Sequence, residues 1–265
     1  MSFRATILGC GSSGGVPRLG AMWGACDSQN PKNRRRRCGL LVERLGHGRH
    51  TTVLVDTSPD LREQLLSVRC EALDGVLYTH DHADHTHGID DLRMLAYAMK
   101  RRIDVWADAG TLASLEARFG YCFATQPGSS YPPILSAHTL SPPAPVHIGG
   151  STGIVEAVPV PQTHGDIASL GFRFGGLAYS PDISDVPEAA AKLMRGLDVW
   201  IVDALRFTPH PSHFSVKQAL AWIDRLKPKR AILTHMTTDL DYAALQRELP
   251  EGVEPAYDGM VVEFG

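Results

Sequence analysis

The chain contains no hydrophobic run long enough to cross a membrane and no framework of paired cysteines. No apolar stretch approaches the ~18 residues of a membrane-spanning helix. The start of the chain, Met1-Ser2-Phe3-Arg4, is not followed by the apolar core of a signal peptide. The five cysteines, an odd number without close pairing, favour a reducing compartment over a disulfide scaffold. We therefore predict a cytoplasmic protein without a membrane partner.

A strong charge of either sign is also missing. The net charge of −3 gives no general attraction to nucleic acid or to membranes. With 43% hydrophobic and 21% charged residues, the composition is that of a globular protein with a sizeable core. A length of 265 residues suits one large layered domain, since such folds routinely reach this size. We therefore predict a single domain spanning residues 1–265.

The most distinctive stretch is Thr79-His80-Asp81-His82-Ala83-Asp84-His85, directly after the strand-like run Gly75-Val76-Leu77-Tyr78. Imidazole and carboxylate groups together suit divalent transition metals. Alternate side chains of an extended segment share a face, so His80 and His82 are expected to point at one cation. A turn after Ala83 would bring Asp84 and His85 to a second cation. A solvated histidine-rich loop is the alternative, and the spacing favours the metal site.

This heptapeptide resembles the signature of the metallo-β-lactamase superfamily at every position. The resemblance implies an α+β fold, a four-layer αββα sandwich with two mixed β-sheets and a binuclear metal site along one edge. It also implies three further ligands downstream: a lone histidine, a bridging aspartate and a final histidine. The sequence supplies His164, Asp182 and His235 in that order.

The resemblance assigns a role to each of these residues. One metal is held by His80, His82 and His164, the other by Asp84, His85 and His235, and Asp182 bridges them. Two divalent transition metal ions, zinc or manganese, are the implied cofactors, and a metal-bridging hydroxide is the implied nucleophile. Asp84 and Asp182 therefore count as catalytic. For Asp182 the alternative is capping of a helix predicted over residues 186–193, and we favour the ligand. Asp56 matches a carboxylate that braces the metal loop, with a simple turn residue as a nearly equal alternative.

A glycine-rich loop, Gly9 to Pro17, follows the first predicted strand. Loops of this kind expose backbone N–H groups to an anion, so Gly11, Ser12, Ser13 and Gly14 are predicted to bind substrate. A flexible turn is the alternative. Phosphoribosyl cyclic phosphodiesterases and ribonuclease Z begin similarly, whereas lactamase-like and glyoxalase-like members usually do not. The resemblance is therefore to the phosphodiesterase branch of the superfamily.

Members of that branch cleave cyclic ribose phosphates or RNA ends. We therefore expect a binuclear metal-dependent phosphodiesterase acting on a cyclic ribose phosphate or a nucleotide-type phosphodiester. His213 is the candidate donor of a proton to the leaving oxygen and a candidate substrate-binding residue; capping of the following helix is its alternative. His210 is a less favoured candidate of the same type, because Pro209 and Pro211 stiffen its backbone.

Two other functions stay open at this point. Ribonuclease Z-like RNA processing shares the site but usually involves a protruding basic arm, which we do not find in the sequence. Lactone or thioester hydrolysis uses the same metals without a phosphate loop. The expected partner is a small phosphodiester or nucleotide, without a stable nucleic-acid complex, and a homodimer is compatible with the sequence.

Several other segments carry expectations. The phosphonate-pathway relatives hold a structural zinc with a C-x-C-x-x-C run, but here Ala21 and Trp23 precede Cys26, so no such zinc is predicted. The run Arg34 to Arg37 is predicted to be a solvated face, with some members near the mouth of the site. Residues 126–150 are predicted to be a long surface connection, either a lid or an insertion. A helix is predicted through Leu66, with Ser58 as N-cap and Pro59 in the first position.

Overall fold

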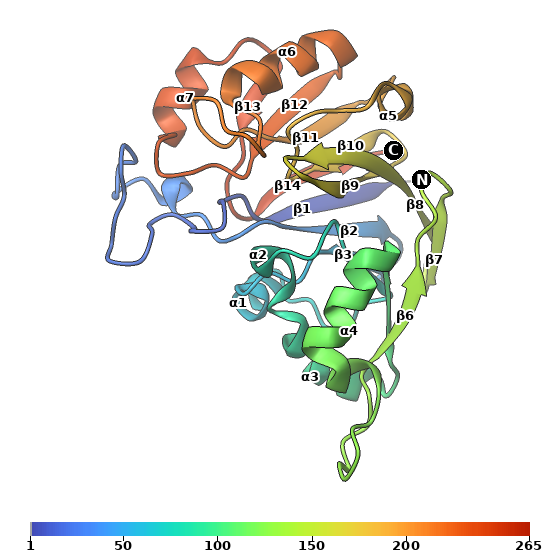
Figure 1. The fold of residues 1–265 in the computed structure, drawn as a ribbon. Helices are drawn as coiled ribbons and strands as arrows, with labels where there is room; N and C mark the ends of the chain where they lie inside the picture. Colours follow the sequence, from blue (N-terminus) through green and yellow to red (C-terminus); the bar gives the residue numbers. More distant parts are fainter. Residues whose placement is uncertain (1) are drawn as a thin grey trace.

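The computed structural model describes residues 2–265, in which two seven-stranded β-sheets pack face to face (Figure 1). The first sheet has the spatial order β14 (Met260–Phe264), β1 (Phe3–Gly9), β2 (Gly39–Leu45), β3 (His50–Val55), β4 (Gly75–Leu77), β5 (Ile103–Ala107) and β6 (Leu135–Thr139). The second has the order β13 (Val253–Pro255), β12 (Arg230–Thr234), β11 (Val199–Asp203), β10 (Leu177–Ser180), β9 (Ile167–Phe174), β8 (Gly153–His164) and β7 (Val146–Gly150). Both sheets mix parallel and antiparallel pairs.

The alternation of side chains along each strand divides the apolar residues between two cores. In β3, Val53 and Val55 face the second sheet, whereas Leu54 faces the helices on the other side. Strands β10 and β11 are buried along their whole length. Such continuous burial is typical of parallel strands covered on both faces.

Helices cover the outer face of each sheet (Figure 1). On the first sheet these are α1 (Leu61–Ser67), α3 (Leu92–Met99) and α4 (Ala109–Phe123), which share the core of Leu54. On the second they are α5 (Glu188–Leu193), α6 (Val216–Leu226) and α7 (Tyr242–Glu248), which join the central core. The short helices α2 (Ala83–Thr86), η1 (Pro31–Asn33) and η2 (Ile89–Asp91) lie in connections. The predicted α+β four-layer sandwich with two mixed sheets is confirmed.

Parallel pairing brings the functional segments to one edge. Strands β3 and β4 run parallel, as do β10, β11 and β12. The carboxyl ends of parallel strands meet at the same edge of a sheet. This edge therefore brings together five residues that end or follow these strands: Asp56, His80, Asp182, Asp203 and His235. The two sheets therefore contribute to one site.

Some local expectations were wrong. Residues 126–150 are not a structureless connection, since they contain the edge strands β6 and β7. Helix α1 begins at Leu61 rather than Pro59. The Ser58 hydroxyl donates a hydrogen bond to Gln64 and accepts one from the Asp60 amide, which forms a turn before the helix. No helix in residues 2–265 is long and apolar enough to cross a membrane.

Candidate metal centre

The heptapeptide Thr79–His85 is extended up to His82 and helical from Ala83 onwards. His82 is the N-cap of α2, and Asp84 and His85 lie in the first turn of that helix. The expected turn after Ala83 is thus helical, and the His85 amide donates to the His82 carbonyl. Asp81 points elsewhere, since its carboxylate accepts hydrogen bonds from Ser114 and Arg118 of α4.

The two triads that the sequence assigns to separate metals are both assembled. The ligand atoms of His80, His82 and His164 lie within 4.8 Å of one another. The same is true of Asp84, His85 and His235. His164 is the last residue of β8 rather than part of a loop. Four of the six side chains are almost fully buried, whereas His82 is exposed at the mouth.

Asp182 lies between the triads. Its Oδ2 is 2.8 Å from Nε2 of His85, and its Oδ1 is 3.3 Å from Nε2 of His235 and 3.8 Å from Nε2 of His164. Oδ2 therefore contacts the triad of Asp84, His85 and His235, whereas Oδ1 lies between His235 of that triad and His164 of the other. The carboxylate is thus within reach of both triads. Ser169 donates to the Asp182 carbonyl and not to its carboxylate, which stays free for the centre.

Other side chains hold the ligands in orientation. Asp56 is fully buried and accepts hydrogen bonds from the amide and hydroxyl of Thr79, at 2.8 and 2.9 Å. Its Oδ2 is also 2.7 Å from Nδ1 of His85. The backbone of Asp56 has a φ of 65°, a strained conformation for a non-glycine residue. Asp56 thus fixes the His85 ring and leaves Nε2 facing Asp182, which supports the bracing role over a turn residue.

The sequence analysis did not identify Asp203, a second buried carboxylate that contacts a histidine of the centre as Asp56 does. It ends β11, is fully buried, and has Oδ2 at 2.8 Å from Nδ1 of His213 and 3.2 Å from the amide of Ile183. The position could have been found from the arrangement around Asp56, since both aspartates end a parallel strand and orient a histidine. His213 itself lies in the centre, with its ring stacked on His235 at 4.6 Å between centroids.

The histidines of the centre have shifted pKa values. Burial lowers the pKa of His80 well below its usual range and that of His164 to about 4, so both rings are neutral, as metal ligands must be. Burial would also lower the pKa of His235, but Asp182 and Asp84 outweigh it and raise the value to about 9. For His85 the same carboxylates raise the pKa well above its usual range. Without metal, the carboxylates are therefore balanced by protons on histidine.

The residues present fit a metal centre. Nε2 of His80, His85 and His235 and Oδ2 of Asp182 are buried and make no hydrogen bond with correct geometry within residues 2–265. Unpaired buried polar atoms are costly, and a cluster of them pointing at one place calls for an ion. Imidazole and carboxylate donors of this kind suit zinc and manganese.

The glycine-rich loop is only partly available to a ligand. The amides of Gly11 and Ser12 donate to the carbonyls of Arg36 and Met236. The amides of Ser13 and Gly14 donate no hydrogen bond within residues 2–265, and both residues line a cavity beside Asp84. Of the four residues of this loop that were predicted to bind substrate, Ser13 and Gly14 therefore offer backbone donors without a partner within residues 2–265.

The arginine run is not the solvated face that was predicted. Arg35 is only 2% exposed, and its guanidinium donates to the carbonyls of Thr237 and Leu240 at 3.1 and 2.7 Å. Cys26 donates to the carbonyl of Leu240 as well. A buried guanidinium thus joins the Cys26 segment to the loop that follows His235. Arg36 pairs with Asp258, Arg37 pairs with Asp60, and Arg34 alone is exposed.

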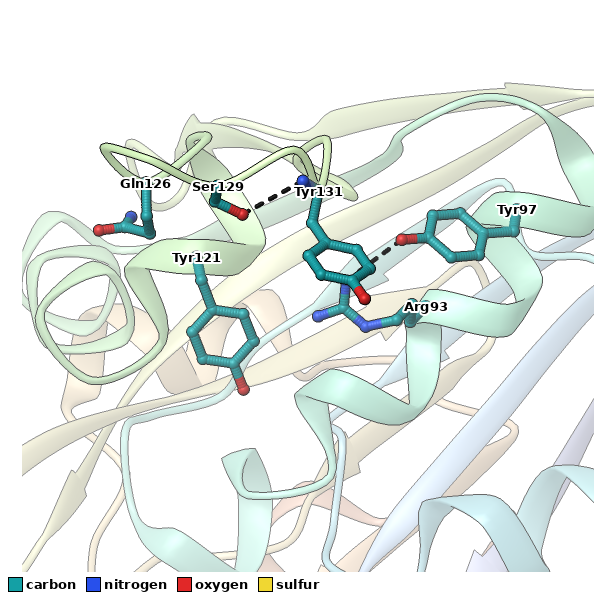
Figure 2. Close-up of a pocket in the computed structure, with 6 residues that line it drawn as sticks. All are labelled: Arg93, Tyr97, Tyr121, Gln126, Ser129 and Tyr131. Atoms are coloured by element: carbon teal, nitrogen blue, oxygen red, sulfur yellow. Dashed lines mark hydrogen bonds between the residues drawn. The ribbon is translucent and has the colours of Figure 1, made fainter.

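A separate cavity of about 300 Å³ lies away from the candidate ligands (Figure 2). The rings of Tyr97, Tyr121 and Tyr131 lie around the guanidinium of Arg93, between α3, α4 and the segment before β6. Arg93 is already ion-paired with Asp90 and donates to the Tyr97 hydroxyl. None of the lining residues belongs to the metal centre. The segment from Gln126 to Tyr131 thus lines this cavity and not the centre.

Comparison with known proteins agrees with this geometry. The model of a beta-lactamase superfamily domain matches residues 51–236. The structure of a new diphosphatase from the PhnP family has a TM-score of 0.89 and 35% identity, covering 100% of this chain and 98% of that chain. An octanoyltransferase of Porphyromonas gingivalis is 32% identical over 97% of this chain, which spans only 51% of that relative.

More distant structures share the fold alone. Zn(2+)-bound PqqB from Methylobacterium extorquens has a TM-score of 0.75 and 17% identity, covering 98% of this chain and 99% of that chain. The short form of human tRNase Z has a TM-score of 0.65 and 19% identity, with 98% of each chain covered. The domain match, the full-length similarity to the diphosphatase and the clustered candidate ligands together show that the chain belongs to the metallo-β-lactamase superfamily and is a metal-dependent hydrolase.

Proposed function

We propose that the protein is a binuclear phosphodiesterase that hydrolyses a nucleotide-sized phosphodiester such as a cyclic ribose phosphate. The position of Asp182 between two three-residue clusters carries this proposal, because it provides for two metal ions close together. Two such ions supply an activated water and stabilise the charge on phosphoryl oxygens. The full-length similarity to a diphosphatase favours phosphorus–oxygen chemistry over lactone or thioester hydrolysis.

His213 is proposed to protonate the leaving oxygen. Its Nδ1 faces Asp203, so Nε2 is the atom left for a substrate. Burial lowers the pKa of His213 to about 4 in the metal-free protein. The ring must therefore acquire its proton in the substrate complex, beside the negative charge of the phosphate. The free amides of Ser13 and Gly14, which line the cavity beside Asp84, are proposed to bind substrate as well.

A panel of diesters tests the proposal. Protein loaded with manganese or with zinc is incubated with 2′,3′-cyclic, 3′,5′-cyclic and ribose 1,2-cyclic phosphates, a precursor tRNA, a lactone and a thioester. We expect hydrolysis of at least one cyclic phosphate, with little action on the last three. Efficient trimming of precursor tRNA without any cyclic phosphate activity would favour the RNA-processing alternative. Lactonase or thioesterase activity alone would refute the phosphodiesterase proposal.

A further inference from the structure

A cavity of about 590 Å³ lies directly beside the metal centre. One wall is formed by Ala83 and Asp84 of α2, the latter a candidate ligand, together with Pro59. Its lining also includes Arg18, Leu19 and Met22, which have no part in the site described so far. The volume is within the range of about 300–1,000 Å³ that small-molecule sites occupy.

Arg18, Leu19 and Met22 belong to a short hairpin, residues 18–22, with a defined backbone. The amide of Arg18 donates to the carbonyl of Met22 at 3.0 Å, and the amide of Met22 donates back at 3.2 Å. The tip turns through Gly20 and Ala21, with φ of 83° and 57°. This geometry holds Leu19 at 95% exposure and Met22 at 57%. Large apolar side chains fixed in solvent at the rim of a cavity point to contact with a ligand.

Arg18 is the unpaired cation of this cavity. No carboxylate within residues 2–265 forms an ion pair or a side-chain hydrogen bond with it, whereas Arg37 in the same cavity pairs with Asp60 at 3.1 Å. Its side chain crosses Gly14: a Cβ added there would lie 3.3 Å from Cγ and 3.5 Å from Nε of Arg18. Because Gly14 has no side chain, the Arg18 guanidinium can lie over the glycine-rich loop.

We propose that this cavity is a nucleoside subsite, in which a heterocyclic base packs against Leu19 and Met22 with the Arg18 guanidinium on its face. The inference rests on the proposed function, since it places the phosphodiester at Asp84 and the nucleoside under the hairpin. A planar base suits this hairpin because it offers apolar faces to the two side chains and a π surface to a weakly hydrated guanidinium. An alkyl chain would make no comparable contact with Arg18.

Two chromogenic esters with the same scissile bond test the subsite: thymidine 5′-monophosphate p-nitrophenyl ester and methyl p-nitrophenyl phosphate. The variants are Arg18→Gln and the double variant Leu19→Ser with Met22→Ser. We expect each to lose about tenfold more kcat/KM on the nucleoside ester than on the methyl ester, the loss typical of one stacking or apolar contact. Arg34→Gln and Leu66→Ser, exposed residues outside the cavity, are matched controls and leave both values unchanged.

Equal losses on the two esters, or none, would overturn the subsite. A parent enzyme that cleaves neither ester and none of the cyclic phosphates would show instead that the proposed function is wrong. In that case, calorimetry measures the binding of thymidine 5′-monophosphate to metal-free protein. This measurement tests the nucleoside subsite independently of hydrolysis. Arg18→Gln should then weaken binding about tenfold relative to Arg34→Gln, and equal affinities would overturn the proposal. The hairpin is exposed, so thermal melts should match the parent protein.

Discussion

Replacement of His213 by alanine tests how the leaving group receives its proton. Loss of a general acid typically costs ~10²–10⁴ in rate. An alkyl ribose diester, whose alkoxide is a poor leaving group, should show the full loss. A p-nitrophenyl ester, whose leaving group needs no proton, should retain much of its activity. The comparison of kcat on the two esters therefore separates proton donation from binding.

The structure also predicts how much stability the protein loses when His213 is replaced by alanine. Removal of the ring leaves Oδ2 of Asp203 with one hydrogen-bond donor within residues 2–265, the amide of Ile183 at 3.2 Å. A buried carboxyl group that loses one of two partners costs about 1–3 kcal/mol of stability. Thermal unfolding should therefore shift modestly while the metal content stays the same. His210→Ala is the matched control, because that ring lies 5.2 Å from the His213 ring but contacts no candidate ligand.

Two results would refute this reasoning. Equal losses of kcat on the alkyl and p-nitrophenyl esters would show that His213 does not donate a proton. Loss of a metal ion in the variant would show that His213 is a ligand, a role that its closeness to His164 and Asp182 also allows.

The remaining predictions concern the metals, their surroundings and the thiols. Elemental analysis of saturated protein should give close to two metal ions per chain, and Asp84→Ala should lower it towards one; an unchanged value near one in both would contradict a binuclear centre. Asp56→Asn should weaken metal affinity about 10–100-fold in chelator competition, because the amide no longer orients His85 as an anion does. Arg35→Met should lower the free energy of unfolding by about 3 kcal/mol in urea titrations, since two buried carbonyls lose their donors; an unchanged midpoint would contradict it. Iodoacetamide at pH 8 should label Cys70 before the four buried cysteines, and slowly, because burial raises the pKa of the Cys70 thiol to about 11.

The candidate ligands were predictable because the signature is local in sequence. His80, His82, Asp84 and His85 stand within six residues, and the other ligands follow strand-like runs. Asp203 was missed because a carboxylate at a strand end resembles any turn residue. Only the pairing of β11 between β10 and β12 brings it to His213.

Other features depended on contacts between distant segments. Arg35 belongs to a basic run that resembles a solvated surface, and its burial depends on carbonyls about 200 residues away in sequence. Similarly, the amides of Gly11 and Ser12 were expected to be free, but the carbonyls of Arg36 and Met236 accept their hydrogen bonds. The start of α1 shifted because the Ser58 hydroxyl is engaged with Gln64. None of these partners is adjacent in sequence.

The division of the centre between the two sheets has a consequence for how the protein matures in the cell. Of the six residues in the two clusters, four lie between His80 and His85, whereas His164 and His235 follow much later in the sequence. Domains fold as units while the chain leaves the ribosome, with the N-terminal part first. The cluster of Asp84, His85 and His235 cannot close until residue 235 has emerged, long after His85. This cluster therefore stays open until β12 has been made and paired, and a chain truncated before β12 would lack it.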